Sequence, residues 1–216
     1  MEDGKSDLAR ASRIREQAAL LVVKPPEVAA EWDDCTNVIR EVCVQAGWLD
    51  VDELISEWIV PQRCDLAFAR NPQAETMGVL VMSGNREFPM RLLRDGWPDL
   101  MMAGVKPAEI VLLAVKREYR SDGVNLALIR EVARYSRQKG VTDLYAILDD
   151  RRFALYRSIG IPFHEVPIGE GGGRRVFAGE ECFPAHFTCA EAVSYLQAHV
   201  PEVWSVLGEE GGETAF

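Results

Sequence analysis

The order of apolar and polar residues between positions 109 and 161 constrains the fold of this chain more than any other feature. Residues 109–115 and 143–148 form two short, almost wholly apolar runs, the pattern of strands that are buried on both faces of a sheet. Residues 123–139, between them, have the length and periodicity of a helix. A strand, a crossover helix and a second strand predict a parallel strand pair.

The flanking segments predict further strands and helices around this unit. Residues 64–70 and 75–84 predict an antiparallel pair, and residues 163–169 and 174–183 predict a terminal hairpin around three glycines. Helical segments are expected at residues 6–23, 26–48, 50–58, 88–102, 151–159 and 190–199. We therefore predict an α+β fold with a mixed, mostly antiparallel central sheet flanked by helices. Residues 1–60 would form a helical N-terminal extension, residues 61–207 the core, and residues 208–216 a disordered tail.

Composition and charge limit the partners of the chain. The 216 residues are 48% hydrophobic and carry a formal net charge of −10, which argues against nucleic acid, because phosphate backbones bind basic surfaces. No apolar run is long enough to span a bilayer and the N-terminus is polar, so we expect a cytoplasmic protein that binds no membrane. The five cysteines form no C-x-x-C pair and no histidine has metal-ligand spacing, which predicts free thiols and no metal.

Basic side chains are concentrated in the central part of the sequence. Residues 101–160 carry 11 basic and 7 acidic side chains, an excess of +4 in an acidic chain. Such an excess suits a phosphorylated or acidic ligand. Arg130, Arg134, Arg137 and Lys139 would equally form the solvated face of one helix, so both interpretations stay open.

A glycine-containing turn connects the first apolar run to the central helix. Val115 ends the run, and Arg120, Gly123, Val124 and Asn125 follow in the turn and the start of the helix. The unpaired N–H groups and the dipole at a helix N-terminus favour a phosphate group. The alternative is an ordinary strand-to-helix turn in which glycine supplies a positive φ.

Two spacings in this region resemble those of the GNAT acyltransferase superfamily. Arg120-x-x-Gly123-x-Asn125 is similar to the family pattern Q/R-x-x-G-x-G/A, with Asn125 in place of the last small residue. Tyr156, four residues before a glycine, resembles the tyrosine of the family's short helix, and Asp149 stands where the family has asparagine. The resemblance covers residues 64–185. It implies a GNAT-like fold in which the two parallel strands splay apart at their carboxyl ends.

The resemblance also implies which residues carry the chemistry. Tyr156 would be the acid that protonates a leaving thiolate, and Glu109 the base for an attacking amine, with Asp65 and Glu118 as further candidate carboxylates. The alternatives are a half-buried tyrosine that bonds a backbone carbonyl and a solvated carboxylate at a strand end. The donor would be bound by Val115, Arg120, Gly123, Val124, Asn125 and Asp149.

Within that superfamily the chain looks most like the acyl-homoserine-lactone synthases and the N-acyl amino acid synthases. Glu109 opens a strand as in those enzymes, and residues 91–93 reproduce their Arg-Leu-Leu run. Arg40 and Trp48 fall in the segment that is similar to their amine-substrate region. The resemblance implies that Trp48 and Asp65 contact the amine substrate.

Val111 and Leu112 depart from the autoinducer synthases, which have serine and arginine at these positions, so that specific activity does not follow. We expect an autoinducer-synthase-like N-acyltransferase. Its donor would be an acyl-CoA or an acyl-phosphopantetheine arm on an acyl-carrier protein, and its acceptor the amine of a small molecule such as an amino acid. The alternatives are a small-molecule N-acetyltransferase that uses acetyl-CoA and a non-catalytic domain that binds acyl thioesters.

Overall fold

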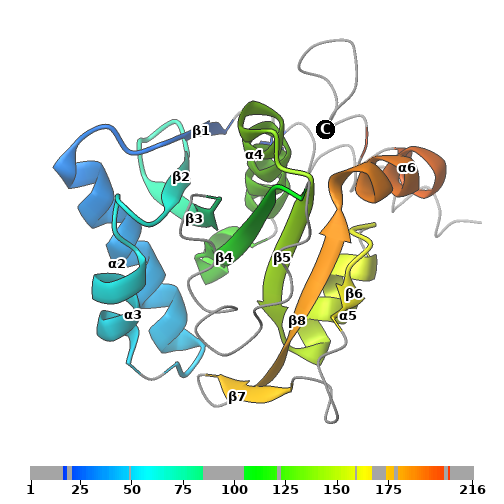
Figure 1. Cartoon of the computed structure of the whole chain (residues 1–216). Coiled ribbons are helices and arrows are strands. Elements are labelled where there is room, and N and C mark those ends of the chain that lie inside the picture. Colours follow the sequence, from blue (N-terminus) through cyan, green and yellow to red (C-terminus); the bar gives the residue numbers. More distant parts are fainter. Residues whose placement is uncertain are drawn as a thin grey trace, which may run out of the picture.

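The computed structural model describes residues 17–18, 21–48, 50–84, 105–120, 123–158, 160–166, 174–177, 180–201 and 204. In Figure 1 these residues form one central sheet with helices packed around it. The strands are β1 (Val22–Lys24), β2 (Asp65–Arg70), β3 (Thr76–Ser83), β4 (Pro107–Val115), β5 (Asp143–Leu148), β6 (His164–Glu165), β7 (Arg175–Phe177) and β8 (Glu180–Thr188). The helices are α2 (Ala29–Gln45), α3 (Val51–Trp58), α4 (Val124–Lys139), α5 (Asp150–Ser158) and α6 (Cys189–His199), with a 3₁₀ turn at Arg117–Tyr119.

The described strands run in the order β1-β2-β3-β4-β5-β8-β6, and β7 pairs with β8. Among these described strands only β4 and β5 are parallel, and every other described pair is antiparallel. The predicted α+β class, with a mixed and mostly antiparallel sheet, is therefore confirmed.

The two parallel strands separate at their carboxyl ends. They pair from Pro107 opposite Asp143 to Ile110 opposite Ala146. Beyond Ile110, β4 continues to Val115 beside β3, whereas β5 continues beside β8. The parallel pairing and the splay predicted from the sequence are both present, and the space between the strands widens from Ile110 onward.

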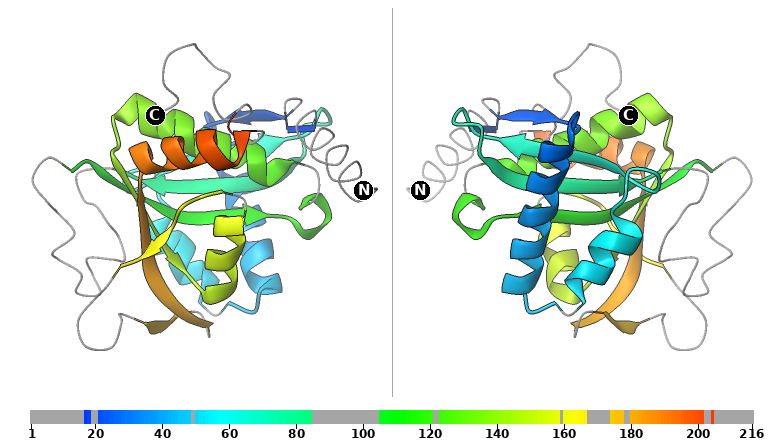
Figure 2. Two further views of the ribbon diagram at one scale, coloured as in Figure 1. Left: turned by 90° about the vertical axis from the view of Figure 1, so that its right-hand side faces the viewer. Right: turned by 90° about the vertical axis from the view of Figure 1, so that its left-hand side faces the viewer.

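Helices cover both faces of the sheet (Figure 2). On one face α2 and α3 pack over β2, β3 and β4, with Ile39 and Phe68 fully buried at this contact. On the other face α4 packs over β2, β3 and β4, and its Leu128 is fully buried in the same core as Leu144 of β5. The apolar positions of α4 recur at helical spacing, and Gly140 ends the helix in the left-handed conformation with its N–H bonded to Arg137 and Ser136.

The structure corrects the expected course of the chain before α2. Val22 and Val23 belong to strand β1, which pairs with β2, and not to the end of a helix over residues 6–23. Pro25 and Pro26 follow directly, and proline keeps the preceding residue extended, so a strand is the better fit there. Gln17 and Ala18 are helical, and residues 6–16 of the expected helix lie outside the described part of the chain.

The expected terminal hairpin is also built differently. Its second arm, residues 174–183, is divided between β7 and β8, and β8 runs on to Thr188. The first arm meets β8 beyond the predicted end, with His164 opposite His186. Pro184 lies inside β8 and interrupts the strand pattern of the sequence, yet its carbonyl accepts a hydrogen bond from the N–H of Val166.

Several expectations fall on residues that the structure does not describe. They are the helical segment 88–102 with its Arg-Leu-Leu run, the glycine turn at 171–173 and the tail 208–216. Within the described ranges, we find no helix with both the length and the apolar character needed to cross a membrane.

Candidate active site

A cavity of about 890 Å³ opens where β4 and β5 part. Its walls come from β4, β5, β8 and the helices α2, α4, α5 and α6. Seven of the ten residues that the sequence suggested for the site line it: Trp48, Glu109, Val115, Arg120, Asn125, Asp149 and Tyr156. Gly123, Val124 and Asp65 are not part of its lining. The cavity therefore collects residues that are up to 108 positions apart in the sequence (48 to 156) in one place.

The first turn of α4 lies at one end of this cavity. Gly123 has φ 75° and ψ 1° and directly precedes the helix, so a residue with a side chain would be strained there. The side chain of Val124 is fully buried and packs on Gly78 of β3, where a Cβ would lie only 2.9 Å from Val124 Cγ1. This close packing fixes the helix start beside the end of β4, with its first N–H groups free of intrahelical partners.

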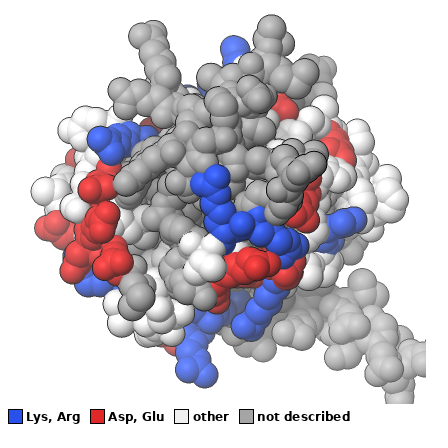
Figure 3. Space-filling model, turned by 60° about the horizontal axis from the view of Figure 1, so that its bottom comes forward, with Lys and Arg blue, Asp and Glu red and all other residues white. Residues whose placement is uncertain are grey.

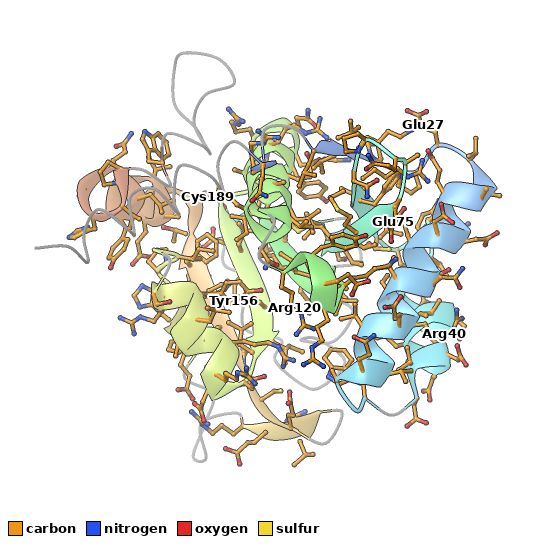
Figure 4. The ribbon with its side chains drawn as sticks, turned by 180° about the vertical axis from the view of Figure 1, so that it is seen from behind. Glu27, Arg40, Glu75, Arg120, Tyr156 and Cys189 are labelled. Atoms are coloured by element: carbon orange, nitrogen blue, oxygen red, sulfur yellow. The ribbon has the colours of Figure 1, made fainter. Side chains whose placement is uncertain are left out.

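Arg120 stands next to this helix start. Its Nε donates a hydrogen bond to the carbonyl oxygen of Val115 at 3.3 Å, which places the guanidinium over the end of β4. Figure 4 shows Arg120 between β4 and α4, and Tyr156 on the neighbouring helix α5. A guanidinium beside free backbone N–H groups is a suitable environment for a phosphate group.

Tyr156 is presented to the cavity by α5. Its ring packs against Phe163 with 5.7 Å between ring centroids. Burial raises the pKa of Tyr156, Arg152 opposes this effect and Asp149 adds to it, so the phenol stays protonated at neutral pH. Asp149 directly precedes the helix, and its Oδ1 accepts a hydrogen bond from the N–H of Arg152 at 2.6 Å.

Glu109 lies at the point where the two strands separate. It is the third residue of β4, only 2% exposed, and it pairs with Ser83 of β3 and Tyr145 of β5. The interpretation as a solvated carboxylate at a strand end is therefore wrong. Glu118, the other carboxylate considered nearby, is exposed in the 3₁₀ turn and does not line the cavity.

Asp65 and Arg40 lie apart from the cavity. Asp65 accepts a hydrogen bond from the hydroxyl of Tyr135 at 2.9 Å and lies 3.8 Å from Lys139 Nζ, so it links β2 to α4. Arg40 pairs with Asp52 on the exposed side of α2 and α3. The structure thus brings Trp48 to the site and leaves Asp65 and Arg40 outside.

Comparison with known proteins shows that the chain resembles solved structures in its fold. No family model matches the chain, and no curated protein matches its sequence. Among solved structures, FeeM, an N-acyl amino acid synthase from uncultured soil microbes, aligns with TM-score 0.65 and 15% identity over 82% of this chain and 96% of FeeM. A GCN5-related N-acetyltransferase from Kribbella flavida aligns with TM-score 0.52 and 18% identity over 79% of this chain and 98% of that one. The chain has the GNAT fold.

A further GNAT structure supports the same assignment. The ribosomal-protein-S18-alanine N-acetyltransferase from Escherichia coli aligns with TM-score 0.53 and 14% identity, over 78% of this chain and 93% of that enzyme. The GNAT-like fold expected from the resemblance is therefore confirmed, with an N-acyl amino acid synthase among the structures of the same fold.

Sequence reasoning did not identify Arg152 and Glu180 as part of the site. Arg152 forms ion pairs with Asp149 and with Glu180, the latter at 2.8 Å, and its guanidinium lies 6.0 Å from the ring centroid of Trp48. The acidic and basic pairs at positions 149–152 were the only local signal, since Glu180 comes from a distant strand. Figure 3 looks onto this end of the molecule and shows Lys and Arg side chains directly beside Asp and Glu side chains.

The cysteines within the described residues are buried, and the histidines have hydrogen-bond partners in the protein. All five cysteines are buried and free, and burial raises the pKa of Cys43, which lines the cavity, to about 11. His164 pairs with Glu191 and His186 with Asp143. Within the described ranges no group of three or more His, Cys, Asp or Glu side chains is placed to hold a metal ion.

Proposed function

We propose that this protein is an N-acyltransferase that moves an acyl group from a thioester donor to the amine of a small molecule. The observation that carries the proposal is the single cavity that runs from the start of α4 past Tyr156 and Glu109 at the splay of β4 and β5. Arg120, Tyr156 and Glu109 all line this cavity, and they would supply the phosphate contact, the acid and the base that transfer from a thioester on a phosphorylated carrier arm needs.

The donor arm has a natural path along β4. Among the strands that the structure describes, only β3 pairs with β4 from Val111 to Val115, because β5 has moved away. Backbone groups on the open side of this segment need partners, and the amides of a pantetheine arm can supply them in the manner of an added strand. The arm would then end with its phosphates at Arg120 and the first turn of α4.

The chemistry needs two proton transfers. The amine nitrogen attacks the thioester carbonyl, the C–N bond forms and the C–S bond breaks, and the products are an amide and a free thiol. Glu109 would take the proton of the amine, directly or through water, and Tyr156 would give its proton to the leaving sulfur. Burial keeps the phenol of Tyr156 protonated, as this role requires.

We further propose that the acyl group is carried on CoA or an acyl-carrier protein and that the acceptor is an amino acid or a related amine. The likeness to FeeM, with a higher TM-score than the two acetyltransferases above, supports this choice. The cavity of about 890 Å³ is near the upper end of the usual range for small-molecule sites. An acetyl group would leave much of its apolar wall without contacts.

A binding experiment followed by a product search tests the proposal. CoA and pantetheine are titrated into the protein by calorimetry. The protein is then incubated with acyl-CoAs from acetyl to dodecanoyl and a panel of amino acids, and the amides are identified by mass spectrometry. Products with acetyl-CoA alone would favour the N-acetyltransferase alternative. Donor binding without any amide would favour a non-catalytic binding domain, and failure to bind CoA, pantetheine and acyl-carrier protein would refute the proposal.

A further inference from the structure

Arg152 is a cavity-lining side chain that lies close both to the segment around α2 and to Tyr156. Its side chain is 38% exposed, and its guanidinium lies 6.0 Å from the ring centroid of Trp48. Its positive charge opposes the rise in pKa that burial causes in Cys43 of α2 and in Tyr156. A ligand bound to Arg152 would therefore be near the proposed acid.

The hydrogen bonds of Arg152 leave one edge of its guanidinium open. Nη1 donates to Asp149 Oδ2 and, at 2.8 Å, to Glu180 Oε2. Nε and Nη2 donate no side-chain hydrogen bond to any residue in the described ranges. A carboxylate binds a guanidinium most strongly through two parallel N–H···O bonds. Nε and Nη2 together present such a pair of donors.

The two carboxylates that bind Nη1 hold the guanidinium in place. Asp149 directly precedes α5 and Glu180 begins β8, so Arg152 is held from two separate elements. A side chain that is already ordered loses less conformational freedom when a ligand binds. The open edge of Arg152 is therefore preorganised for a planar, negatively charged group.

The charged residues of the cavity favour a ligand that carries charges of both signs. Three basic and three acidic residues of the described chain line it: Arg120, Arg151, Arg152, Glu109, Asp149 and Glu180. Their formal charges balance, so a zwitterion disturbs this balance less than a ligand with a net charge. An α-amino acid is such a zwitterion.

We propose that the Nε–Nη2 edge of Arg152 binds the carboxylate of the amine substrate, so that the acceptor is a free α-amino acid and not a simple amine or an amide. This inference rests on the proposed acyl transfer and names its class of acceptor. The carboxylate and the amine nitrogen of an α-amino acid are attached to the same carbon. Binding the carboxylate at Arg152 therefore keeps the nitrogen in the part of the cavity that Tyr156 lines.

Matched acceptors that differ only in the carboxylate test this inference. The common amino acids, their carboxamides and the amines that remain after loss of the carboxylate are each offered with the acyl-CoAs named above. Amide formation is followed by mass spectrometry, and kcat/KM is measured for every acceptor that reacts. The wild-type protein should use an amino acid better than its carboxamide and its amine by at least about tenfold.

Variants of Arg152 show whether this side chain causes the preference. In Arg152→Met the ratio of kcat/KM for the amino acid to that for its carboxamide should fall several-fold, through a higher KM for the amino acid. Arg152→Lys keeps the charge but lacks the two-donor edge, so its ratio should also fall, and it decides the question if Arg152→Met does not fold. Arg157→Met, on the exposed side of the same helix, should keep the wild-type ratio.

The outcomes separate this inference from the proposed function. If carboxamides or simple amines react as well as amino acids in the wild-type protein, the carboxylate site is refuted and acyl transfer still stands. If the folded Arg152 variants lower kcat/KM equally for all three kinds of acceptor, Arg152 has only a structural role and the inference is refuted. If none of the acceptors is acylated, the proposed function fails and the carboxylate site fails with it.

Discussion

Arg152 of α5 lies with its guanidinium 6.0 Å from the ring centroid of Trp48, in the turn that follows α2. The same guanidinium pairs with Asp149 and with Glu180 of β8. One side chain therefore links three walls of the cavity. Because Trp48 belongs to the N-terminal helical part of the chain, this contact connects that part to the cavity wall formed by α5 and β8.

Replacing Arg152 with methionine should weaken binding of the amine substrate, which we expect to contact the neighbouring Trp48. Methionine keeps much of the packing and removes the charge, so we expect a several-fold rise in the KM for the amine, with donor affinity unchanged. The stability should fall by roughly 1 kcal/mol, because the lost contacts are partly exposed. Arg157→Met is the control, since Arg157 lies over Phe153 on the same helix and does not line the cavity. Equal effects of both variants on the KM would contradict the assignment.

Replacing the glycines at the two ends of α4 distinguishes the effect of backbone strain from an effect on donor binding. Gly123 has φ 75° and Gly140 has φ 65°, so valine at either position should cost about 1–2 kcal/mol of stability. Only Gly123→Val should also weaken CoA binding, by tenfold or more, because its side chain would obstruct the approach of a phosphate to the helix start. Thermal unfolding and calorimetry on the two variants test this. A folded Gly123→Val protein with the donor affinity of Gly140→Val would remove the phosphate site from α4.

The sequence suggested that Asp65 and Trp48 both contact the amine substrate. The structure predicts different effects when each is replaced, because only Trp48 lines the cavity. Trp48→Ala should raise the KM for the amine, because the indole lines the cavity. Asp65→Ala should leave the KM unchanged and lower the stability by about 1 kcal/mol, through the loss of the hydrogen bond from Tyr135. Steady-state kinetics with chemical denaturation distinguishes the two. A KM effect of Asp65→Ala as large as that of Trp48→Ala would mean that Asp65 reaches the substrate.

The parts of the fold that local patterns determine could be predicted, and the parts that depend on distant partners could not. The strands around Glu109 and Tyr145 are continuous apolar runs, so their presence and parallel pairing follow from the sequence. Strand β1 is three residues long and exists because β2 offers it a partner, which no local periodicity reveals. Strand β8 contains Pro184, which local rules interpret as a strand end.

The same distinction applies to the site. Tyr156 and Arg120 were predicted because each lies in a motif with fixed spacing near a helix end. Arg152 joins the site through Trp48 and Glu180, which are 104 positions before it and 28 positions after it in the sequence (48, 152 and 180).

Glu109→Gln tests the carboxylate at the strand splay. Glutamine has nearly the same shape and cannot accept the amine proton, so turnover should fall by roughly 10²–10⁴-fold while CoA affinity stays the same. Glu118→Gln makes the same chemical change on the exposed 3₁₀ turn and should have no effect. Presteady-state kinetics at saturating donor and amine gives the measurement. Unchanged turnover in Glu109→Gln would assign proton removal to another group or to water.

Tyr156→Phe tests the acid. Phenylalanine keeps the ring contact with Phe163, so stability and CoA affinity should change little, whereas turnover should fall by roughly 10²–10⁴-fold. Tyr135→Phe is the matched control, because its hydroxyl bonds Asp65 outside the cavity and its loss should lower only stability.

The pH dependence gives an independent measure of the same hydroxyl. Burial raises the pKa of Tyr156 above its ordinary value of 10.0, so the acid keeps its proton over the whole neutral and mildly alkaline range. The decline of kcat caused by its ionisation should therefore lie above pH 10. Because the unfolded state loses this proton first, Tyr156 should also reduce the stability of the protein as the pH rises above about 10. The Tyr156→Phe protein should lack both alkaline effects. A wild-type kcat that falls between pH 7 and 9, with the same fall in Tyr156→Phe, would show that another group titrates and that Tyr156 has a structural role.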